Sequence, residues 1–253
     1  MPRFVVLQPH NDDGIIAIGG TILKLLKNGW KGTYVYYTDG RHGSNTIDPE
    51  KLKEIRKEEA KKEREFIGIK EQHDFCIEDG KLSKISKDLK ERLVEETAKI
   101  IKNADVLFLP NKGEHHPDHR ATYEIGKKAL EIADGISILE VEYVVWQLPF
   151  RKFDPGDFEK IIKVDLSEEE FLKKIKAIRL HESQIKEGFY DEMVICLNRY
   201  YALLPPHQKN QKFCEVLGIP KINDKLKLFL DALESYLDIT TILHGRESEN
   251  IKN

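Results

Sequence analysis

The amino-acid sequence predicts an α/β fold in which a mainly parallel sheet lies between two layers of helices. Short apolar runs alternate with amphipathic segments through the first 150 residues, as in strands joined by helical crossovers. The apolar runs are almost continuously hydrophobic, which is typical of parallel strands covered on both faces. A chain of 253 residues is long enough to bury most of its apolar surface without disulfides.

The expected strands are the apolar runs Arg3–Gln8, Thr33–Thr38, His73–Ile77, Val106–Pro110 and Glu142–Leu148. The segments between them have helical periodicity at Ile18–Asn28, Pro49–Ile67, Ser83–Asn103 and His119–Ile132. Local signals support these bounds: Asp48-Pro49 is a favourable helix start, and Gly29 and Gly68 stand where helices end. This alternation predicts a Rossmann-like three-layer sandwich.

The pattern changes after Leu148. We expect a further strand at Lys160–Val164 and then a helix at Ser167–His181, which begins with a capping box formed by Ser167 and Glu170. The last fifty residues are less regular, and Lys221–Tyr236 is the helical pattern among them. We therefore predict a main domain of residues 1–204 and a helical C-terminal extension, residues 205–253, packed on the same domain.

Composition excludes several classes of partner. The net charge of −3 gives no basic field that would recruit nucleic acid or a membrane surface. No apolar run approaches the length of a membrane span, and Phe4–Leu7 is too short for the core of a signal peptide. Cys76, Cys196 and Cys214 form no C-x-x-C pair. We therefore expect a cytoplasmic protein with reduced cysteines and no membrane span.

Histidines and carboxylates gather after two of the expected strands. His10-Asn11-Asp12-Asp13 follows the first strand, and His116-Pro117-Asp118-His119 follows the fourth. In open α/β sheets, sites form at the carboxyl ends of the strands. Zinc binds imidazole nitrogen and carboxylate oxygen, and a catalytic zinc site keeps one position open for water. The two motifs supply three ligands and leave groups over for proton transfer, which predicts a hydrolytic metal enzyme.

The two motifs resemble the signatures of the PIG-L/LmbE-like zinc N-deacetylases, which remove acetyl groups from N-acetylglucosamine-type substrates. Further segments resemble the family in the same order: Gly19-Gly20-Thr21, Thr38-Asp39-Gly40, Arg56-Lys57-Glu58-Glu59, and Ala177 with His181-Glu182-Ser183-Gln184. The resemblance spans about residues 3–185. It implies a zinc-dependent hydrolase that acts on a small amino-sugar substrate or its conjugate and yields acetate and a free amine.

The resemblance also implies the roles of individual residues. His10, Asp13 and His119 would hold one Zn²⁺ ion. Asp12 would be the general base for the attacking water, and His116 would be the acid or electrophilic partner of the tetrahedral intermediate.

Two further residues are assigned in the same way, and two positions depart from the family. Asp118 would orient His116 or tune its charge, and Arg56 would contact the sugar hydroxyls. Asn11 stands where the family usually has proline, which removes a constraint on φ. Gly14 stands where the family has glutamate. Neither departure removes a ligand or the base.

Other functions stay open at this point. One alternative is a metal-dependent amidase or esterase with a non-sugar substrate, because the sequence does not fix the shape of the pocket loops. Another is a non-catalytic module that binds sugar or metal, although a pure metal site needs neither Asp12 nor His116. A nucleotide-binding protein is disfavoured, since no G-x-G-x-x-G follows the first strand. Analogy with the family also allows a homo-oligomer.

Overall fold

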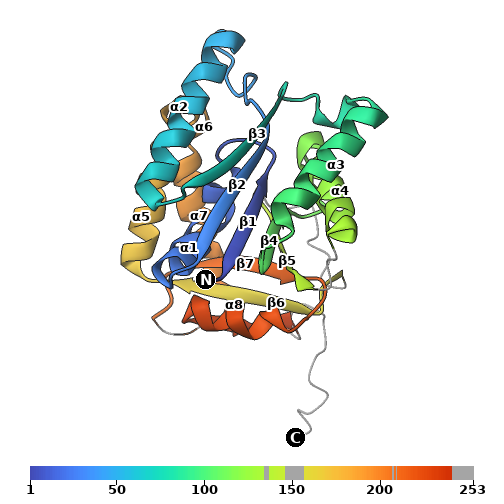
Figure 1. Ribbon diagram of the computed structural model, residues 1–253. Coiled ribbons are helices and arrows are strands. Elements are labelled where there is room, and N and C mark those ends of the chain that lie inside the picture. Colours follow the sequence, from blue (N-terminus) through green and yellow to red (C-terminus); the bar gives the residue numbers. More distant parts are fainter. Residues whose placement is uncertain (134–136, 146–156, 207, 209, 241–253) are drawn as a thin grey trace, which may run out of the picture.

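The computed structural model describes residues 1–133, 137–145, 157–206, 208 and 210–240. These residues form one sheet of eight strands in the order β3-β2-β1-β4-β5-β7-β6-β8 (Figure 1). The parallel strands are β1 (Arg3–Gln8), β2 (Lys31–Thr38), β3 (Glu71–Ile77), β4 (Val106–Pro110) and β5 (Leu139–Tyr143). The strands that complete the sheet in antiparallel pairing are β6 (Lys160–Leu166), β7 (Phe213–Ile219) and β8 (Tyr236–Asp238). The predicted α/β class is therefore confirmed.

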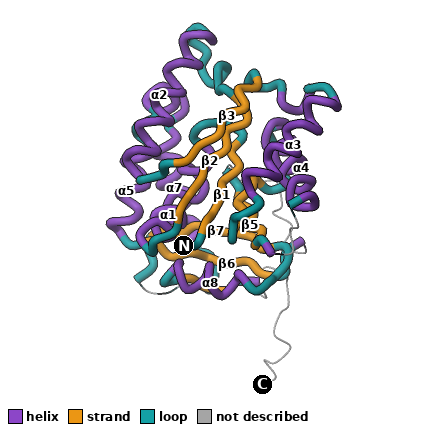
Figure 2. Tube along the Cα trace, viewed as in Figure 1, coloured by secondary structure: helices purple, strands orange, loops and turns teal. Residues whose placement is uncertain are grey.

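Helices cover both faces of the parallel half of the sheet (Figure 2). One face carries α1 (Asp13–Lys27), α2 (Pro49–Ile67), α5 (Glu168–Ile178), α6 (Glu182–Gly188) and α7 (Tyr190–Leu203). The opposite face carries α3 (Lys87–Ile101) and α4 (Pro117–Ile132), with a short 3₁₀ helix η1 (Leu82–Lys84) before α3. Helix α8 (Lys225–Leu233) packs against α1. No helix in the described ranges is both long and apolar enough to span a lipid bilayer.

The strands separate two apolar cores because successive side chains of a strand point to opposite faces. In β1, Phe4 and Val6 belong to the core beneath α1, α2 and α5. Val5 and Leu7 belong to the core beneath α3 and α4. All four side chains are at most 3% exposed, which agrees with the continuous apolar runs of the sequence.

Local signals fix the bounds of α2 and the start of α5 as predicted. The side chain of Asp48 accepts a hydrogen bond from Lys51 N, and Pro49 occupies the first turn of α2. Helix α2 ends at Gly68, whose φ of 98° is a left-handed conformation that glycine adopts without strain. The capping box of Ser167 and Glu170 is present at α5.

Helix α1 departs from the prediction of Ile18–Asn28, because it begins at Asp13 and is kinked at Ile18, where φ is −129° and ψ is 23°. The carboxylate of Glu215 accepts hydrogen bonds of 2.8 Å from the backbone N–H groups of Gly20 and Thr21. Since these N–H groups open the second half of the helix, the buried carboxylate acts as its cap. This distant partner is not visible in the local sequence.

The predicted strand Glu142–Leu148 is displaced. Strand β5 runs from Leu139 to Tyr143, because it pairs in register with β4 from Val106 to Pro110. Residues 146–148 of the prediction lie outside the described part of the chain.

The prediction of a helical extension over residues 205–253 is wrong for its central part. Strand β7 lies inside the sheet, between β5 and β6, and pairs with β6 from Phe213 to Ile219. The predicted helix Lys221–Tyr236 is shorter, since α8 ends at Leu233 and Tyr236 begins β8. Residues 241–253 of the extension lie outside the described ranges.

Candidate functional site

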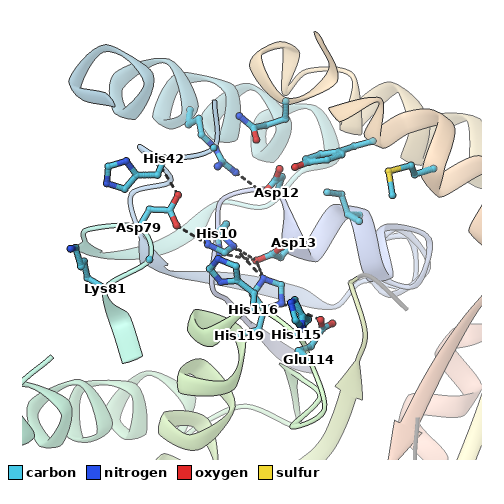
Figure 3. A pocket seen from close by; sticks show the side chains of 17 residues that line it. His10, Asp12, Asp13, His42, Asp79, Lys81, Glu114, His115, His116 and His119 are labelled. Atoms are coloured by element: carbon cyan, nitrogen blue, oxygen red, sulfur yellow. Dashed lines mark hydrogen bonds and ion pairs between the residues drawn. The ribbon is translucent and has the colours of Figure 1, made fainter. Parts of the chain in front are cut away.

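A cavity of about 790 Å³ opens beyond the carboxyl ends of β1, β2, β3 and β4 (Figure 3). Its volume is within the range of small-molecule sites. The side chains that line it come from the loops after these strands and from α1, α2, α4, α6 and α7. They include His10, Asp12, Asp13, His42, Arg56, Asp79, Lys81, Glu114, His115, His116, His119, Gln184, Tyr190 and Met193.

The three predicted metal ligands converge on one point of this cavity. His10 Nδ1 lies 3.1 Å from Asp13 Oδ2 and 3.3 Å from His119 Nε2. The third side of the triangle, from His119 Nε2 to Asp13 Oδ2, is 3.4 Å. Ligands about 2.0–2.1 Å from a tetrahedral zinc ion lie about 3.3–3.4 Å apart. The chemistry and the spacing of these three atoms therefore fit a zinc ion.

Each of these three side chains is held by a different element. His10 follows β1, and its backbone N–H donates a 2.7 Å hydrogen bond to Asp13 Oδ2. Asp13 is the first residue of α1, and His119 lies in the first turn of α4. Because both helices begin at the carboxyl edge of the sheet, two segments more than a hundred residues apart bring their side chains together, as Figure 3 shows.

Two carboxylates that were not predicted from the sequence contact the far nitrogens of the histidines. Asp79 Oδ1 lies 3.1 Å from His10 Nε2, and Glu114 Oε2 lies 3.5 Å from His119 Nδ1. Asp79 follows β3 in the turn Glu78-Asp79-Gly80, which is the same strand-end position that singled out the other site residues. Glu114 lies two residues before His116 in the loop after β4, so the same strand-end position could have pointed to it.

The charges of this cluster change the protonation of its members. Burial by itself lowers the pKa of His10, but the carboxylates of Asp13 and Asp79 outweigh it and raise this pKa to about 10. For Asp13, burial opposes ionisation, while His119 and His10 hold its pKa well below the usual range. The site is therefore an acidic pocket that favours positive charge where the three ligand atoms meet.

Asp12 and Arg56 form a buried ion pair on the wall of the cavity. Arg56 Nη2 donates a 2.7 Å hydrogen bond to Asp12 Oδ1, and Nη1 donates to the carbonyl of Gly40 at 3.2 Å. The two side chains are 3% and 7% exposed. Gly40 has a φ of 68°, and a Cβ atom there would lie 2.8 Å from the guanidinium, so this position requires glycine. Arg56 thus contacts Asp12, while its predicted contact with sugar stays a prediction.

His116 lies beside the three candidate metal ligands. Its ring centroid lies 4.8 Å from that of His10 and 5.4 Å from that of His119. Burial and the neighbouring His10 and His119 lower its pKa. Its Nδ1 accepts a 3.2 Å hydrogen bond from the backbone N–H of Asp118. The neutral ring therefore carries its proton on Nε2, which leaves that atom as a hydrogen-bond donor.

The resemblance implies that Asp118 orients His116 or tunes its charge, and the carboxylate of Asp118 forms its hydrogen bonds with another loop. It is fully buried and accepts hydrogen bonds from the backbone N–H groups of Gly80, at 2.7 Å, and Leu82, at 3.1 Å. Asp118 therefore anchors the loop that carries Asp79, and the orientation of His116 comes from the Asp118 backbone instead. The charge of Asp118 opposes the lowering of the His116 pKa.

The segment His181-Glu182-Ser183-Gln184 forms part of the cavity wall on α6. Glu59 of α2 accepts hydrogen bonds from Ser183 N at 2.8 Å and from Ser183 Oγ at 2.7 Å. This contact joins α2 to α6 and places Gln184 in the lining of the cavity. His181 lies behind the wall, buried, with Nε2 3.8 Å from Glu63.

The sequence is similar to known deacetylases. Residues 5–130 match the family model described as GlcNAc-PI de-N-acetylase, PIG-L. The chain is 28% identical over 239 residues to the diacetylchitobiose deacetylase of Thermococcus kodakarensis, a match that covers 86% of this chain and 84% of that protein.

Solved structures share the fold. The N,N'-diacetylchitobiose deacetylase of Pyrococcus horikoshii aligns with a TM-score of 0.65 at 23% identity, over 89% of this chain and 88% of that one. The 4-carboxy-2-hydroxymuconate hydratase of Pseudomonas putida KT2440 also aligns with a TM-score of 0.65, at 18% identity, over 88% and 99%. Since deacetylases and a hydratase share this architecture, the fold alone does not decide the reaction.

Proposed function

Because the chain belongs to the PIG-L (GlcNAc-PI de-N-acetylase) family, we propose that it is a zinc-dependent N-deacetylase of an N-acetylglucosamine-type amino sugar or conjugate. The reaction would add water across the acetamide and give acetate and a free amine. The observation that carries this proposal is the triangle of His10 Nδ1, Asp13 Oδ2 and His119 Nε2 in a cavity that the buried carboxylate of Asp12 also lines.

One zinc ion per chain would be held by His10, Asp13 and His119. When bound, such an ion supplies Lewis acidity, which lowers the pKa of water and polarises an amide carbonyl. Asp79 and Glu114 support this assignment, since metal-binding histidines usually donate their other N–H group to a carboxylate.

The protein groups around this point divide proton transfer and hydrogen bonding between them. Arg56 binds Asp12 Oδ1, which leaves Oδ2 to accept the proton of the attacking water. The Nε2–H group of His116 donates a hydrogen bond to the oxygen that becomes negative when the carbonyl carbon turns tetrahedral. As the C–N bond breaks, the amine nitrogen takes the proton that Asp12 received from the water. Asp12 thus returns to its ionised form, and His116 keeps its Nε2 proton throughout the cycle.

The substrate is proposed from the size and lining of the cavity. A space of about 790 Å³ accommodates an amino sugar with room for an attached group, and Gln184, Tyr190 and Met193 offer polar and apolar contacts on one wall. The similar protein of Thermococcus kodakarensis is a diacetylchitobiose deacetylase, which makes this disaccharide the first compound to test. A cytoplasmic location and a homo-oligomeric state stay predictions from the sequence.

The experiment is to measure acetate and free amine from N-acetylglucosamine and diacetylchitobiose with the protein loaded with Zn²⁺ or Co²⁺. We expect equal amounts of acetate and amine, and no release after chelation of the metal. A folded, metal-loaded protein that is inert on a broad panel of N-acyl compounds overturns the proposal. Activity confined to esters or to non-sugar amides would instead favour the amidase or esterase alternative.

A further inference from the structure

We propose that Glu114 is a positioning residue that sets the metal-binding tautomer of His119 and ties this ligand to the end of β5. The inference rests on the metal site of the proposed function. It concerns a residue that contributes no ligand atom and takes no part in the proton transfer of Asp12 or the hydrogen bond of His116.

Glu114 is fixed at both its backbone and its side chain. Its backbone N–H donates to Asn111 O at 3.1 Å, and its carbonyl accepts from Arg120 Nη1 at 3.0 Å. Its carboxylate is 2% exposed, with Oε1 accepting a 2.5 Å hydrogen bond from Val145 N. The second oxygen, Oε2, lies 3.5 Å from His119 Nδ1. Glu114 therefore bridges the chain just beyond β5 and a ligand on α4.

The tautomer of His119 decides whether it can bind a metal. Its Nε2 faces His10 and Asp13, so this nitrogen must be free of a proton to act as a ligand. In a neutral imidazole the proton is then on Nδ1. Nδ1 is buried, and it forms no hydrogen bond with any residue of the described ranges. The carboxylate of Glu114, paired with it at 3.5 Å, is the group that stabilises a proton at this position.

A carboxylate suits this place better than an amide for a geometric reason. Val145 N–H and His119 Nδ1–H are both donors. Glu114 offers a separate acceptor oxygen to each, Oε1 to Val145 and Oε2 to His119. A glutamine has one acceptor and one donor at its end. If its oxygen keeps Val145, its NH₂ group faces His119 Nδ1 and favours the tautomer with the proton on Nε2, which cannot bind metal. If its oxygen turns to His119, the contact to Val145 is lost.

Asp79 contacts His10 in the same manner from another side. Its Oδ1 lies 3.1 Å from His10 Nε2, and its Oδ2 accepts a 3.2 Å hydrogen bond from the backbone N–H of His42. The two histidines thus use opposite nitrogens towards the metal point, and each has a carboxylate at the nitrogen that keeps the proton. This correspondence supports the role of Glu114 as the residue that sets the tautomer of His119.

The test compares metal binding by the wild-type chain and by Glu114→Gln, Glu114→Ala and Glu114→Asp, with Glu142→Gln as the matched control. Glu142 is also a buried glutamate near the loop, but it accepts its hydrogen bond from Asn111 Nδ2 and contacts none of the proposed metal ligands. Zinc affinity is measured by competition with a chromophoric chelator, and the coordination of Co²⁺ by its visible absorption. Thermal unfolding of each metal-free protein reports whether it is folded.

We expect Glu114→Gln and Glu114→Ala to bind zinc about 10–100-fold more weakly and to change the Co²⁺ spectrum. Glu114→Asp retains two acceptor oxygens and should recover part of the affinity, while Glu142→Gln should bind as the wild type does. If Glu114→Gln does not fold, the comparison of Glu114→Ala with the wild type still decides, since an unchanged zinc affinity and Co²⁺ spectrum there overturn the inference.

An unchanged zinc affinity and Co²⁺ spectrum in Glu114→Gln also overturn the inference. Because the assay contains no substrate, it separates this inference from the proposed function: a chain with Glu114-dependent zinc affinity and no deacetylase activity contradicts only the function.

Discussion

Arg56 Nη2 donates a 2.7 Å hydrogen bond to Asp12 Oδ1 inside the cavity, and both side chains are almost fully buried. The family resemblance implies a contact of Arg56 with the sugar, which stays a prediction, and the structure shows Arg56 against the carboxylate that we assign as the base. Arg56 therefore fixes the position of Asp12, whatever contact it makes to a substrate.

Replacing Arg56 with methionine tests this pair. Asp12 would be left buried without its partner, a change that typically costs about 3–5 kcal/mol of stability. We expect a lower free energy of unfolding in urea and a large fall in kcat. The double variant Arg56→Met with Asp12→Asn should regain stability but not activity. An effect on KM alone, with stability unchanged, would show instead that Arg56 serves only the substrate.

Metal binding should stabilise the folded chain. The triangle of His10, Asp13 and His119 exists only in the folded state, so zinc at a hundred times its Kd should add about 2.7 kcal/mol to the free energy of unfolding. Differential scanning calorimetry with and without a chelator measures this shift. Asp13→Asn should lose most of it. An equal shift in both proteins would mean that the metal binds elsewhere.

Glu59 should stabilise the cavity wall from behind. It accepts two hydrogen bonds from Ser183 while being 5% exposed, so Glu59→Ala leaves two buried donors without a partner, at about 1–3 kcal/mol for each group. We expect a lower midpoint of urea unfolding and a raised KM, because Gln184 loses its support. A variant with exposed Glu96→Ala should behave as the wild type. Unchanged stability and KM in Glu59→Ala would contradict this role.

The pKa of Glu142 gives a prediction for the pH dependence of stability. Burial, assisted by Glu140, raises this pKa to about 8. Between pH 4.5, where the unfolded chain ionises this residue, and pH 8, the folded chain retains a proton that the unfolded chain loses. The free energy of unfolding contributed by Glu142 therefore falls as the pH rises through this window.

Glu142→Gln is neutral at every pH and can still accept the hydrogen bond from Asn111. Its stability relative to the wild type should increase from pH 5 to pH 8 and then stay level. Urea unfolding at pH 5, 6.5 and 8 measures this difference. Parallel pH profiles of the two proteins would show that the carboxyl group is not held protonated by the fold.

The sequence was sufficient for elements whose ends depend on local residues. Helix α2 has the predicted bounds because Asp48, Pro49 and Gly68 act within one turn of its ends. Strands β1 and β4 have the predicted bounds because both faces are buried, which makes them continuous apolar runs. The site motifs follow these strands, so their convergence could be predicted from the parallel sheet.

The parts that could not be predicted depend on distant partners. Strand β7 carries the charged Glu215 in its centre, and this residue is buried because Lys174 pairs with it at 2.7 Å and Gly20 and Thr21 donate hydrogen bonds to it. Asp79 and Glu114 follow strand ends in the sequence, but the sequence does not show which histidine each of them contacts. They become part of the site because β3 and the β4–α4 loop bring them to the far nitrogens of His10 and His119.

The most direct test of the account is the acetate release and metal content of Asp12→Asn, measured side by side with the wild type. The account assigns Asp12 to proton transfer and the neighbouring Asp13 to the metal. We expect one zinc ion per chain in the variant and a rate lower by about 10²–10⁴-fold, the usual effect of removing a general base. Wild-type turnover in a zinc-loaded Asp12→Asn protein would contradict this division of roles.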